Sequence, residues 1–246
     1  MTNPLILRLN SYAKLSQADR ALVDRVAGRT TRDVQPRRDV VREGDKPRAV
    51  HLVLEGWACR YKQLPDGRRQ VVSFFIPGDL CDTNVFILRE MDHSVAAVSR
   101  LRVAEIAPTD FESMIQESAR IAQALWWNEL VNAATSREWT TNIGQRTAYE
   151  RLSHLLLEMF TRQEAVGLTR DHSCPFPLTQ VDLADACGLT AVHVNRTLQE
   201  LRRDKLIELH GRMLTLLDRR ALTEVAMFNP NYLHLEREGR HLDAND

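Results

Sequence analysis

The chain has 246 residues, 43% of them hydrophobic and 27% charged, which is typical of globular proteins that dissolve in water. Lys and Arg total 33, as do Asp and Glu, so a nucleic-acid-binding surface requires a local concentration of positive charge. The sequence has no apolar run of the roughly 20 residues that span a membrane, no signal-peptide pattern and no C-x-x-C pair. These absences argue against a membrane span, a zinc knuckle and a disulfide framework, and we expect a cytoplasmic protein without a metal or cofactor.

The first half of the chain predicts a short helix followed by an antiparallel structure. Ser16 and Asp19 have the spacing of a capping box, which predicts a helix over residues 16–28. Between residues 39 and 108, short runs rich in Val, Ile and Phe are separated by turn signals such as Pro65-Asp66-Gly67. Evenly spaced short strands with such turns favour an antiparallel roll or barrel.

From residue 109 onward the sequence is typical of helices. One or two short helices are expected, followed by a long helix over 118–143 and another over 146–164. The long helix has an imperfect apolar stripe, which leaves two roles open: packing on the roll or dimerisation. The stripe consists of Ile121, Ala124, Leu125, Val131 and Ala134, and it is interrupted by Asn128, Thr135 and Glu138.

Residues 178–203, LTQVDLADACGLTAVHVNRTLQELRR, contain two short helical patterns on either side of a glycine. Thr179 and Thr190 each precede one helix as candidate caps, and Gly188 supplies the backbone freedom for the turn between them. The second helix carries Val194, Leu198 and Leu201 at spacings i, i+4 and i+7, which predicts its buried face. Because a hairpin pattern with a turn at His210-Gly211 follows, the segment predicts a winged helix-turn-helix.

The opposite face of the second helix is the candidate DNA-binding surface. A helix-turn-helix places the start of this helix in the major groove, where Arg196 has the chemistry to bind guanine O6 and N7. Ala191 and Val192 have the chemistry to contact thymine methyl groups, while Thr190 and His193 lie where phosphates pass. The candidate DNA-contacting residues are Thr190, Ala191, Val192, His193, Asn195, Arg196, Gln199, Arg203 and Arg212.

A structural explanation of the same segment stays open. A packed helical pair with a solvated arginine face has the same pattern, in which Arg196 forms only a surface ion pair with Glu200. Between residues 190 and 220, however, seven basic residues accompany four acidic ones. This local excess of positive charge favours DNA.

Taken in order, these segments resemble the Crp/Fnr family of bacterial transcription regulators, from Leu15 to about Asp218. The run HLVLEGWACRYKQLPDGRRQVVSFFIPGDLCD is similar to the family's cyclic-nucleotide-type β-roll, and the long helix stands where the family dimerises. The resemblance implies an α+β fold: an N-terminal antiparallel β-roll (a cyclic-nucleotide-binding-like jelly roll), a long dimerisation helix and a C-terminal winged helix-turn-helix. The expected boundaries are 1–117 for the roll, 118–143 for the dimerisation helix, 144–220 for the DNA-binding domain and 221–246 for a C-terminal tail. From Asn229 the tail has little hydrophobic pattern and is expected to be partly disordered.

The resemblance also implies what such a protein binds. We expect a homodimer on a two-fold related site in double-stranded DNA, with half-sites about one helical turn apart. RNA polymerase is the further partner that the family implies. An effector bound in the roll would shift the population between two arrangements of the DNA-binding domains.

The effector site departs from the cyclic-AMP-binding pattern. His93-Ser94 stands where an Arg-Ser pair would bind the phosphate, and Asp82 or Thr83 stands near the position of the ribose-binding glutamate. Neutral histidine lacks the bidentate fork that arginine offers an anion, so cyclic AMP is not expected in the usual pose. The effector stays unidentified, and a solvated stripe or a pocket filled by side chains stays open. The candidate effector-pocket residues are Asp82, Thr83, His93, Ser94, Asn132 and Ser136, with Thr140 continuing the stripe.

Other functions find little support in the sequence. No cysteine precedes Cys59, which argues against an N-terminal iron–sulfur cluster, and a lone histidine such as His93 or His51 is a weak haem ligand candidate. Cys59 and Cys81 form a redox pair only if their strands adjoin; otherwise they are packing residues. No Walker loop, G-x-G-x-x-G, H-E-x-x-H or G-x-S-x-G motif suggests an enzyme. The alternative function is a ligand sensor that acts through protein contacts without reading DNA.

Overall fold

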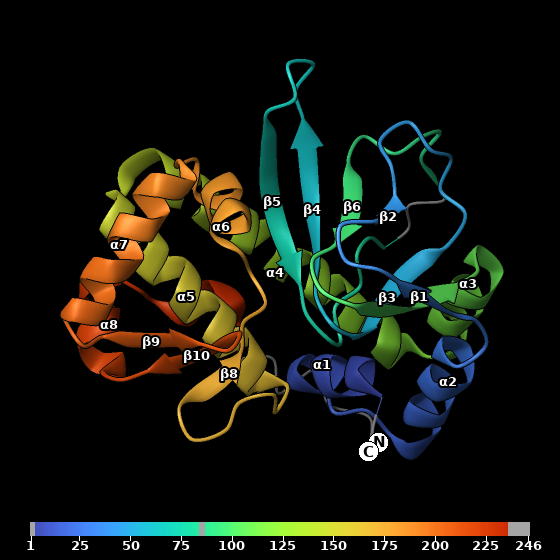
Figure 1. Cartoon of the computed structure of the whole chain (residues 1–246). Helices are drawn as coiled ribbons and strands as arrows, with labels where there is room; N and C mark the ends of the chain where they lie inside the picture. Colours follow the sequence, from blue (N-terminus) through green and yellow to red (C-terminus); the bar gives the residue numbers. More distant parts are fainter. Residues whose placement is uncertain (1–2, 84–86, 236–246) are drawn as a thin grey trace.

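The computed structural model describes residues 3–83 and 87–235, which form a roll and a winged helical domain connected through a long helix (Figure 1). The chain begins with α1 (Pro4–Tyr12), which the sequence analysis did not predict, and continues into α2 (Gln17–Ala27). Both hydrogen bonds of the predicted capping box, between Ser16 and Asp19, are present at the start of α2.

The roll consists of a three-stranded sheet in the order β1-β7-β3 and a four-stranded sheet in the order β2-β6-β4-β5, with antiparallel pairing throughout. The strand runs expected after residue 49 are confirmed, and β1 and β2 are additional. The strands are β1 (Thr31–Val34), β2 (Asp39–Val41), β3 (Val50–Glu55), β4 (Ala58–Gln63), β5 (Arg69–Phe75), β6 (Ser94–Ala97) and β7 (Leu101–Ile106).

Two helices follow the roll, α3 (Pro108–Glu117) and the long α4 (Ala119–Gln145). The predicted apolar stripe of α4 is buried entirely within the chain, so it serves packing against α1, α2 and the roll. On another face of the same helix, the side chains of Trp126 and Leu130 are 79% and 67% exposed. The sequence therefore identified the packing face of α4, and the exposed apolar side chains lie on a different face.

The C-terminal domain contains helices around a three-stranded sheet in the order β8-β10-β9. The helix-turn-helix and the hairpin are confirmed, whereas β8 and α8 were not predicted. The elements are α5 (Ala148–Ala165), β8 (Ser173–Pro175), α6 (Gln180–Cys187), α7 (Ala191–Arg203), β9 (Ile207–His210), β10 (Met213–Leu216), α8 (Arg219–Ala226) and the short 3₁₀ helix η2 (Pro230–Leu233).

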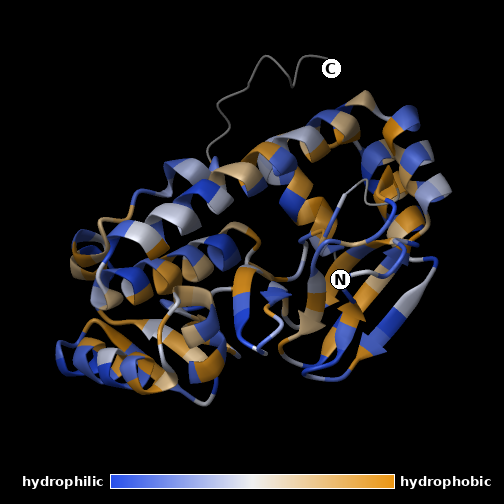
Figure 2. Ribbon diagram, turned by 90° about the horizontal axis from the view of Figure 1, so that it is seen from above, coloured by the Kyte–Doolittle hydropathy of each residue, from blue (hydrophilic) through white to orange (hydrophobic). Residues whose placement is uncertain are grey.

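The roll and the C-terminal domain share one hydrophobic core. Trp57 of the roll packs edge-on against Phe176 of the C-terminal domain, with ring centroids 5.9 Å apart. Phe74 of β5 makes a similar contact with Trp139 of α4, also at 5.9 Å. Figure 2 shows hydrophobic and hydrophilic segments alternating along the helices and strands of both halves. A shared apolar core holds two domains in a fixed arrangement more firmly than a polar interface does.

The C-terminal segment is packed where the sequence analysis expected a loose tail. Tyr232 and Leu233 are buried, and the Tyr232 hydroxyl donates to the carboxylate of Glu158 at 3.0 Å. Residues 229–235 are therefore ordered against the core, which the sequence did not indicate because so short an apolar group shows no periodicity. The remaining predicted tail, 236–246, lies outside the described residues.

The structure separates the two cysteines considered as a redox pair. Cys59 belongs to the core shared by the two domains, whereas Cys81 belongs to the core inside the roll, so they serve packing. Burial raises the pKa of the Cys59 thiol to about 12. In residues 3–83 and 87–235, no helix has the length and apolar character to cross a membrane, and no His, Cys, Asp and Glu side chains gather as a metal site.

Candidate DNA-binding face and effector cavity

Local interactions fix the geometry of the helix-turn-helix. Thr179 and Asp182 form a complete capping box at the start of α6, and Gly188 ends α6 in the left-handed conformation, with φ of 63°. The Thr190 hydroxyl accepts from the backbone of His193 and caps α7. Because these polar groups satisfy the helix ends, the positions at which α6 ends and α7 begins follow from sequence-local chemistry.

The buried face of α7 is the predicted one, since Val194, Leu198 and Leu201 are at most 3% exposed. On the opposite side, Val192 is 81% exposed and the Arg196 side chain is 76% exposed. Figure 1 shows α6 between α7 and β5, so α7 lies on the side away from the roll. Of the predicted contact residues, Thr190, Val192, His193, Arg196, Gln199, Arg203 and Arg212 are exposed, whereas Ala191 and Asn195 are half-buried.

Several polar groups on this face form short-range pairs with close neighbours in the sequence. Arg196 Nε lies 3.3 Å from Glu200 Oε1, as the structural explanation of the segment anticipated. The amide of Gln199 donates to Asn195 at 3.0 Å. Exposed i, i+4 ion pairs are worth only about 0.3–0.5 kcal/mol, so DNA can replace this pairing at little cost.

The wing presents an arginine in an unusual backbone conformation. β9 and β10 are joined through Gly211 and Arg212, whose φ angles are 57° and 64°, as in a type I′ turn. Gly211 adopts this conformation freely, but a side chain such as that of Arg212 disfavours it. An exposed arginine held in a disfavoured conformation at a hairpin tip is a functional candidate.

The helix-turn-helix is attached to the roll through α6. Arg69 of β5 contacts Asp185 at 2.7 Å and Asp182 at 3.0 Å, and its guanidinium stacks on the Tyr61 ring at 5.4 Å. The side chain of Gln70 donates to a backbone carbonyl of α6 at 3.3 Å. These contacts bind α6 to β5 and leave α7 uncovered by the roll.

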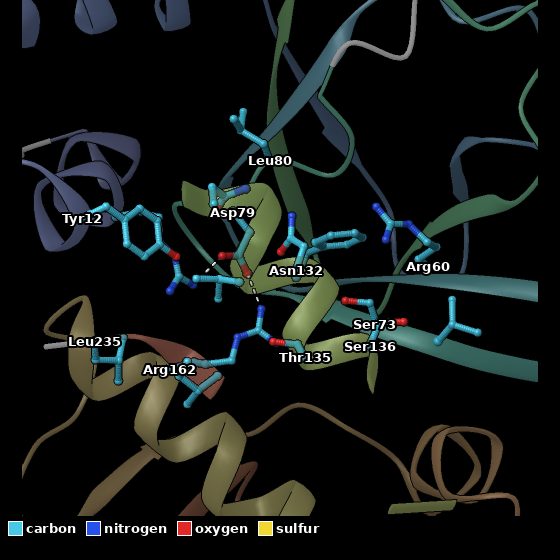
Figure 3. A pocket seen from close by; sticks show the side chains of 16 residues that line it. Tyr12, Arg60, Ser73, Asp79, Leu80, Asn132, Thr135, Ser136, Arg162 and Leu235 are labelled. Carbon is cyan, nitrogen blue, oxygen red and sulfur yellow. Dashed lines mark hydrogen bonds and ion pairs between the residues drawn. The ribbon is translucent and has the colours of Figure 1, made fainter. Parts of the chain in front are cut away.

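A cavity of about 100 Å³ lies where the roll, α1, α4, α5 and the C-terminal segment meet (Figure 3). Its α4 wall carries Asn132, Thr135 and Ser136, and β5 contributes Ser73 opposite them. Three arginines from other elements also line the cavity: Arg8 of α1, Arg60 of β4 and Arg162 of α5. Tyr12, Asp79 and Asn128 complete the polar lining.

The predicted effector residues fall into three places. Asn132 and Ser136 line the cavity, whereas Thr140 does not and instead bonds to the Ser136 carbonyl. Thr83 lies beside the cavity, since its hydroxyl donates to Glu129 at 2.8 Å and the same carboxylate accepts from Asn132.

The other three predicted residues lie in the roll without lining the cavity. Asp82 pairs with Arg60 at 2.7 Å and accepts from His93 at 3.2 Å, so Arg60 connects this cluster to the cavity. The second ring nitrogen of His93 contacts Asp92 at 2.7 Å. Burial opposes the charged imidazole, but hydrogen bonds to both carboxylates outweigh burial and raise the pKa of His93. The Ser94 hydroxyl accepts from the backbone amide of Glu43.

Comparison with known proteins identifies both domains. A model of the cyclic nucleotide-binding domain matches residues 31–118, and a model of the Crp-like helix-turn-helix domain matches residues 150–225. The transcriptional activator protein FnrL of Cereibacter sphaeroides is 32% identical over 74% of this chain and 73% of its own length. The chain belongs to the Crp/Fnr family. As a member of that family it is a sequence-specific DNA-binding regulator of transcription.

Two further relatives from the Crp/Fnr family agree. The nitrogen fixation regulation protein FixK of Bradyrhizobium diazoefficiens is 33% identical over 73% of this chain and 74% of its own length. The solved structure of FixK2 from Bradyrhizobium japonicum has a TM-score of 0.71 and 25% identity, covering 80% of this chain and 96% of FixK2. By name, FnrL is a transcriptional activator and FixK is a regulation protein.

In the roll of this chain, the side chains at the predicted phosphate-binding position are already engaged with other protein groups. The place of the phosphate-binding pair is taken by His93 between two carboxylates, and the Ser94 hydroxyl is already bonded to the backbone. An added anion there would face the carboxylates of Asp82 and Asp92, and the neighbouring guanidinium of Arg60 is already paired with Asp82. Both ring nitrogens of His93 are engaged, so the haem hypothesis gains no support either.

The sequence analysis missed several residues of the cavity. Asp79 was not singled out, and Arg8 belongs to a helix that was not predicted. Arg162 was placed on a helix without a partner. Their partners lie 71 and 83 residues away, so no local pattern signals the contacts.

Proposed function

We propose that the protein acts in the cytoplasm as a homodimer that reads a two-fold related DNA site with α7. The observation that carries this proposal is the division of α7 into a fully buried aliphatic face and a face on which Val192 and Arg196 are exposed. A helix with that geometry fits the major groove, where arginine distinguishes guanine and an isopropyl group contacts a thymine methyl. Arg212 at the wing tip is in reach of the DNA backbone.

The dimer contact that we propose is the exposed face of α4. Trp126 and Leu130 lie one helical turn apart, and exposed Ala133 and Arg137 continue the same face. Exposed side chains of this size in a long helix are typical of an interface with a partner helix. Pairing the two α4 helices would place the α7 helices around one two-fold axis, as a palindromic operator requires.

The effector, where one acts, is proposed to bind in the cavity beside α4. Its volume of about 100 Å³ and its hydroxyl and guanidinium lining favour a small polar molecule over cyclic AMP. The alternative function is a sensor that acts without reading DNA. It is disfavoured because a surface that no longer binds DNA would not be expected to keep exposed arginines such as Arg196 and Arg203 on the groove side.

Selection of bound fragments from random DNA by the full-length protein tests the proposal. We expect a palindromic motif with half-sites about one turn apart. Arg196→Ala should weaken operator binding by roughly 1–3 kcal/mol and relax the preference at one base pair in each half-site. Glu200→Ala is the matched control, because it removes the ion-pair partner and keeps the guanidinium. Failure to enrich any motif would contradict sequence-specific binding.

A further inference from the structure

A buried group of three charges joins parts of the chain that are far apart in the sequence. Asp79, in the turn after β5, contacts Arg8 of α1 and lies 2.8 Å from Arg162 of α5. All three side chains are between 5% and 10% exposed. Figure 3 shows the Asp79 carboxylate facing the guanidinium group of Arg162. We call Arg8, Asp79 and Arg162 the triad.

The triad is fixed from both sides. Asp79 also accepts from the backbone amide of Ile76 at 2.8 Å, which holds the carboxylate against its own turn. Arg162 also donates to the carbonyl of Phe74 at 2.9 Å and pairs with Glu158 at 3.4 Å. Buried charges that lose their partners are costly, so the chain strongly favours the one arrangement in which all of these contacts are made.

The position of α5, which carries Arg162, determines the position of α7, the helix proposed to read DNA. α5 packs against α6, α7 and α8, with Leu152, Leu156 and Phe160 fully or almost fully buried in the shared core. A change in the position of α5 relative to Asp79 therefore moves α7 relative to the roll. The Arg69 contacts with α6 are a second attachment, but they are more exposed, at 17–27% of each side chain.

The triad also forms part of the cavity wall. Arg8, Asp79 and Arg162 line the same space as Asn132 and Ser136 of α4 (Figure 3). A molecule in this cavity would touch the joint between the roll and the DNA-binding domain, in addition to the dimer helix.

We propose that the triad sets the pose of α7 on the roll and thereby the half-site spacing that the dimer accepts. In this role Arg8 and Arg162 are positioning residues that do not contact DNA, and α1 is part of the DNA-reading machinery through Arg8. The proposal rests on the proposed function, because spacing is a property of the bound operator.

The test compares operator binding by full-length variants at three spacings: the selected one, and those with one or two base pairs inserted between half-sites. Each inserted base pair rotates one half-site by about 34° relative to the other. Arg8→Met and Arg162→Met should lower the preference of the protein for the selected spacing by about tenfold, with a smaller effect on the best affinity. Arg25→Met and Arg219→Met are matched controls, since each breaks an exposed ion pair within one domain, and they should keep the wild-type preference.

Spacing tolerance separates positioning from a merely structural role, because lost stability alone lowers the binding-competent fraction equally for every operator. An unchanged spacing preference in both triad variants would overturn the proposal while leaving DNA reading intact. Arg8→Met retains the pair between Asp79 and Arg162, so it keeps the test decisive if Arg162→Met does not fold.

Failure of the proposed function would give a different result, namely no specific operator for any variant. In that case, the rate of amide hydrogen exchange in β5 and α6 reports directly on the contact between the roll and the C-terminal domain. Faster exchange in Arg8→Met than in Arg25→Met supports the view that the triad holds the roll and the C-terminal domain together, and equal exchange refutes it.

Discussion

Replacing Arg212 by glycine should change stability and DNA binding in opposite directions. The φ of 64° at Arg212 is a conformation that costs an ordinary L-residue roughly 1–2 kcal/mol and costs glycine almost nothing. The glycine variant gives back about 0.4–1 kcal/mol of this stabilisation, because glycine gives the unfolded chain more conformational freedom. The net expectation is a protein about 0.5 kcal/mol more stable, which corresponds to a rise of about 1–2 °C in Tm at this chain length.

The effect on DNA binding follows from charge. Each wing would lose one phosphate contact, and a dimer has two wings. The salt dependence of log K has a slope of about −0.9 per neutralised phosphate, so the slope should become less steep by about 2. Because a phosphate contact carries no base information, operator and random DNA should lose affinity by similar factors.

Calorimetry and binding titrations between low and moderate salt measure both quantities. Arg212→Lys is the matched control, because it keeps the charge and the disfavoured conformation, and its slope should stay near that of the wild type. Arg212→Asn should retain much of the stability gain without the charge. A glycine variant with an unchanged salt slope would refute the wing contact, and a less stable one would refute the argument from backbone conformation.

Three other outcomes follow from the structure. Substituting uracil for one contacted thymine in a single half-site should reduce wild-type affinity by about fourfold, the worth of about one methyl group. Val192→Ala should abolish this difference in a competition assay. Leu130→Ala should weaken dimerisation by about a hundredfold in sedimentation equilibrium, because each dimer loses two such side chains; an unchanged dimer would place the interface elsewhere. Burial lowers the pKa of His154 to about 3, whereas a histidine in an unfolded chain has a pKa of about 6.5. The folded protein therefore holds the neutral ring, and the stability present above about pH 6.5 is lost as the pH falls and the unfolded chain takes up the proton. Between about pH 6.5 and pH 3, the free energy of unfolding should therefore fall less for His154→Phe than for the wild type, with a difference of up to about 4 kcal/mol. Urea titrations measure this free energy, and parallel pH curves for the two proteins would contradict the expectation.

The neighbours of His154 explain why its lowered pKa is caused mainly by burial. Glu138 Oε1 lies 3.1 Å from the ring, but the same oxygen pairs with Arg146 at 2.7 Å. The carboxylate is therefore already neutralised by a permanent cation, and the positive charge of Arg146 further disfavours a proton on the imidazole.

Much of the DNA-binding domain was predictable because its determinants are local. The caps at Thr179 and Thr190, the left-handed turn at Gly188 and the buried spacing of Val194 and Leu198 all act within one or two helical turns. Helix geometry then fixes which side chains face away, so the exposed positions of α7 followed from the sequence. Whether these positions contact DNA as proposed stays a prediction.

The roles of α4 and of the candidate pocket were less accessible from the sequence. Periodicity identified an apolar stripe that includes Ile121 and Val131, but periodicity does not say whether a stripe packs on its own chain or on a partner. The structure assigns it to the chain itself and exposes Trp126 and Leu130 instead. Likewise, His93 and Ser136 were grouped as one pocket, although only Ser136 lines the cavity.

The sequence by itself determined the order of the modules, the helix ends and the face that α7 turns to solvent, since these depend on residues at most a few positions apart. Only the tertiary structure decided that Arg8, Asp79 and Arg162 share one buried site and that Tyr232 closes over Glu158. Partners separated by 71 to 83 residues are chosen by the packing of whole elements, and a pairing of buried charges becomes favourable only after that packing has removed them from water.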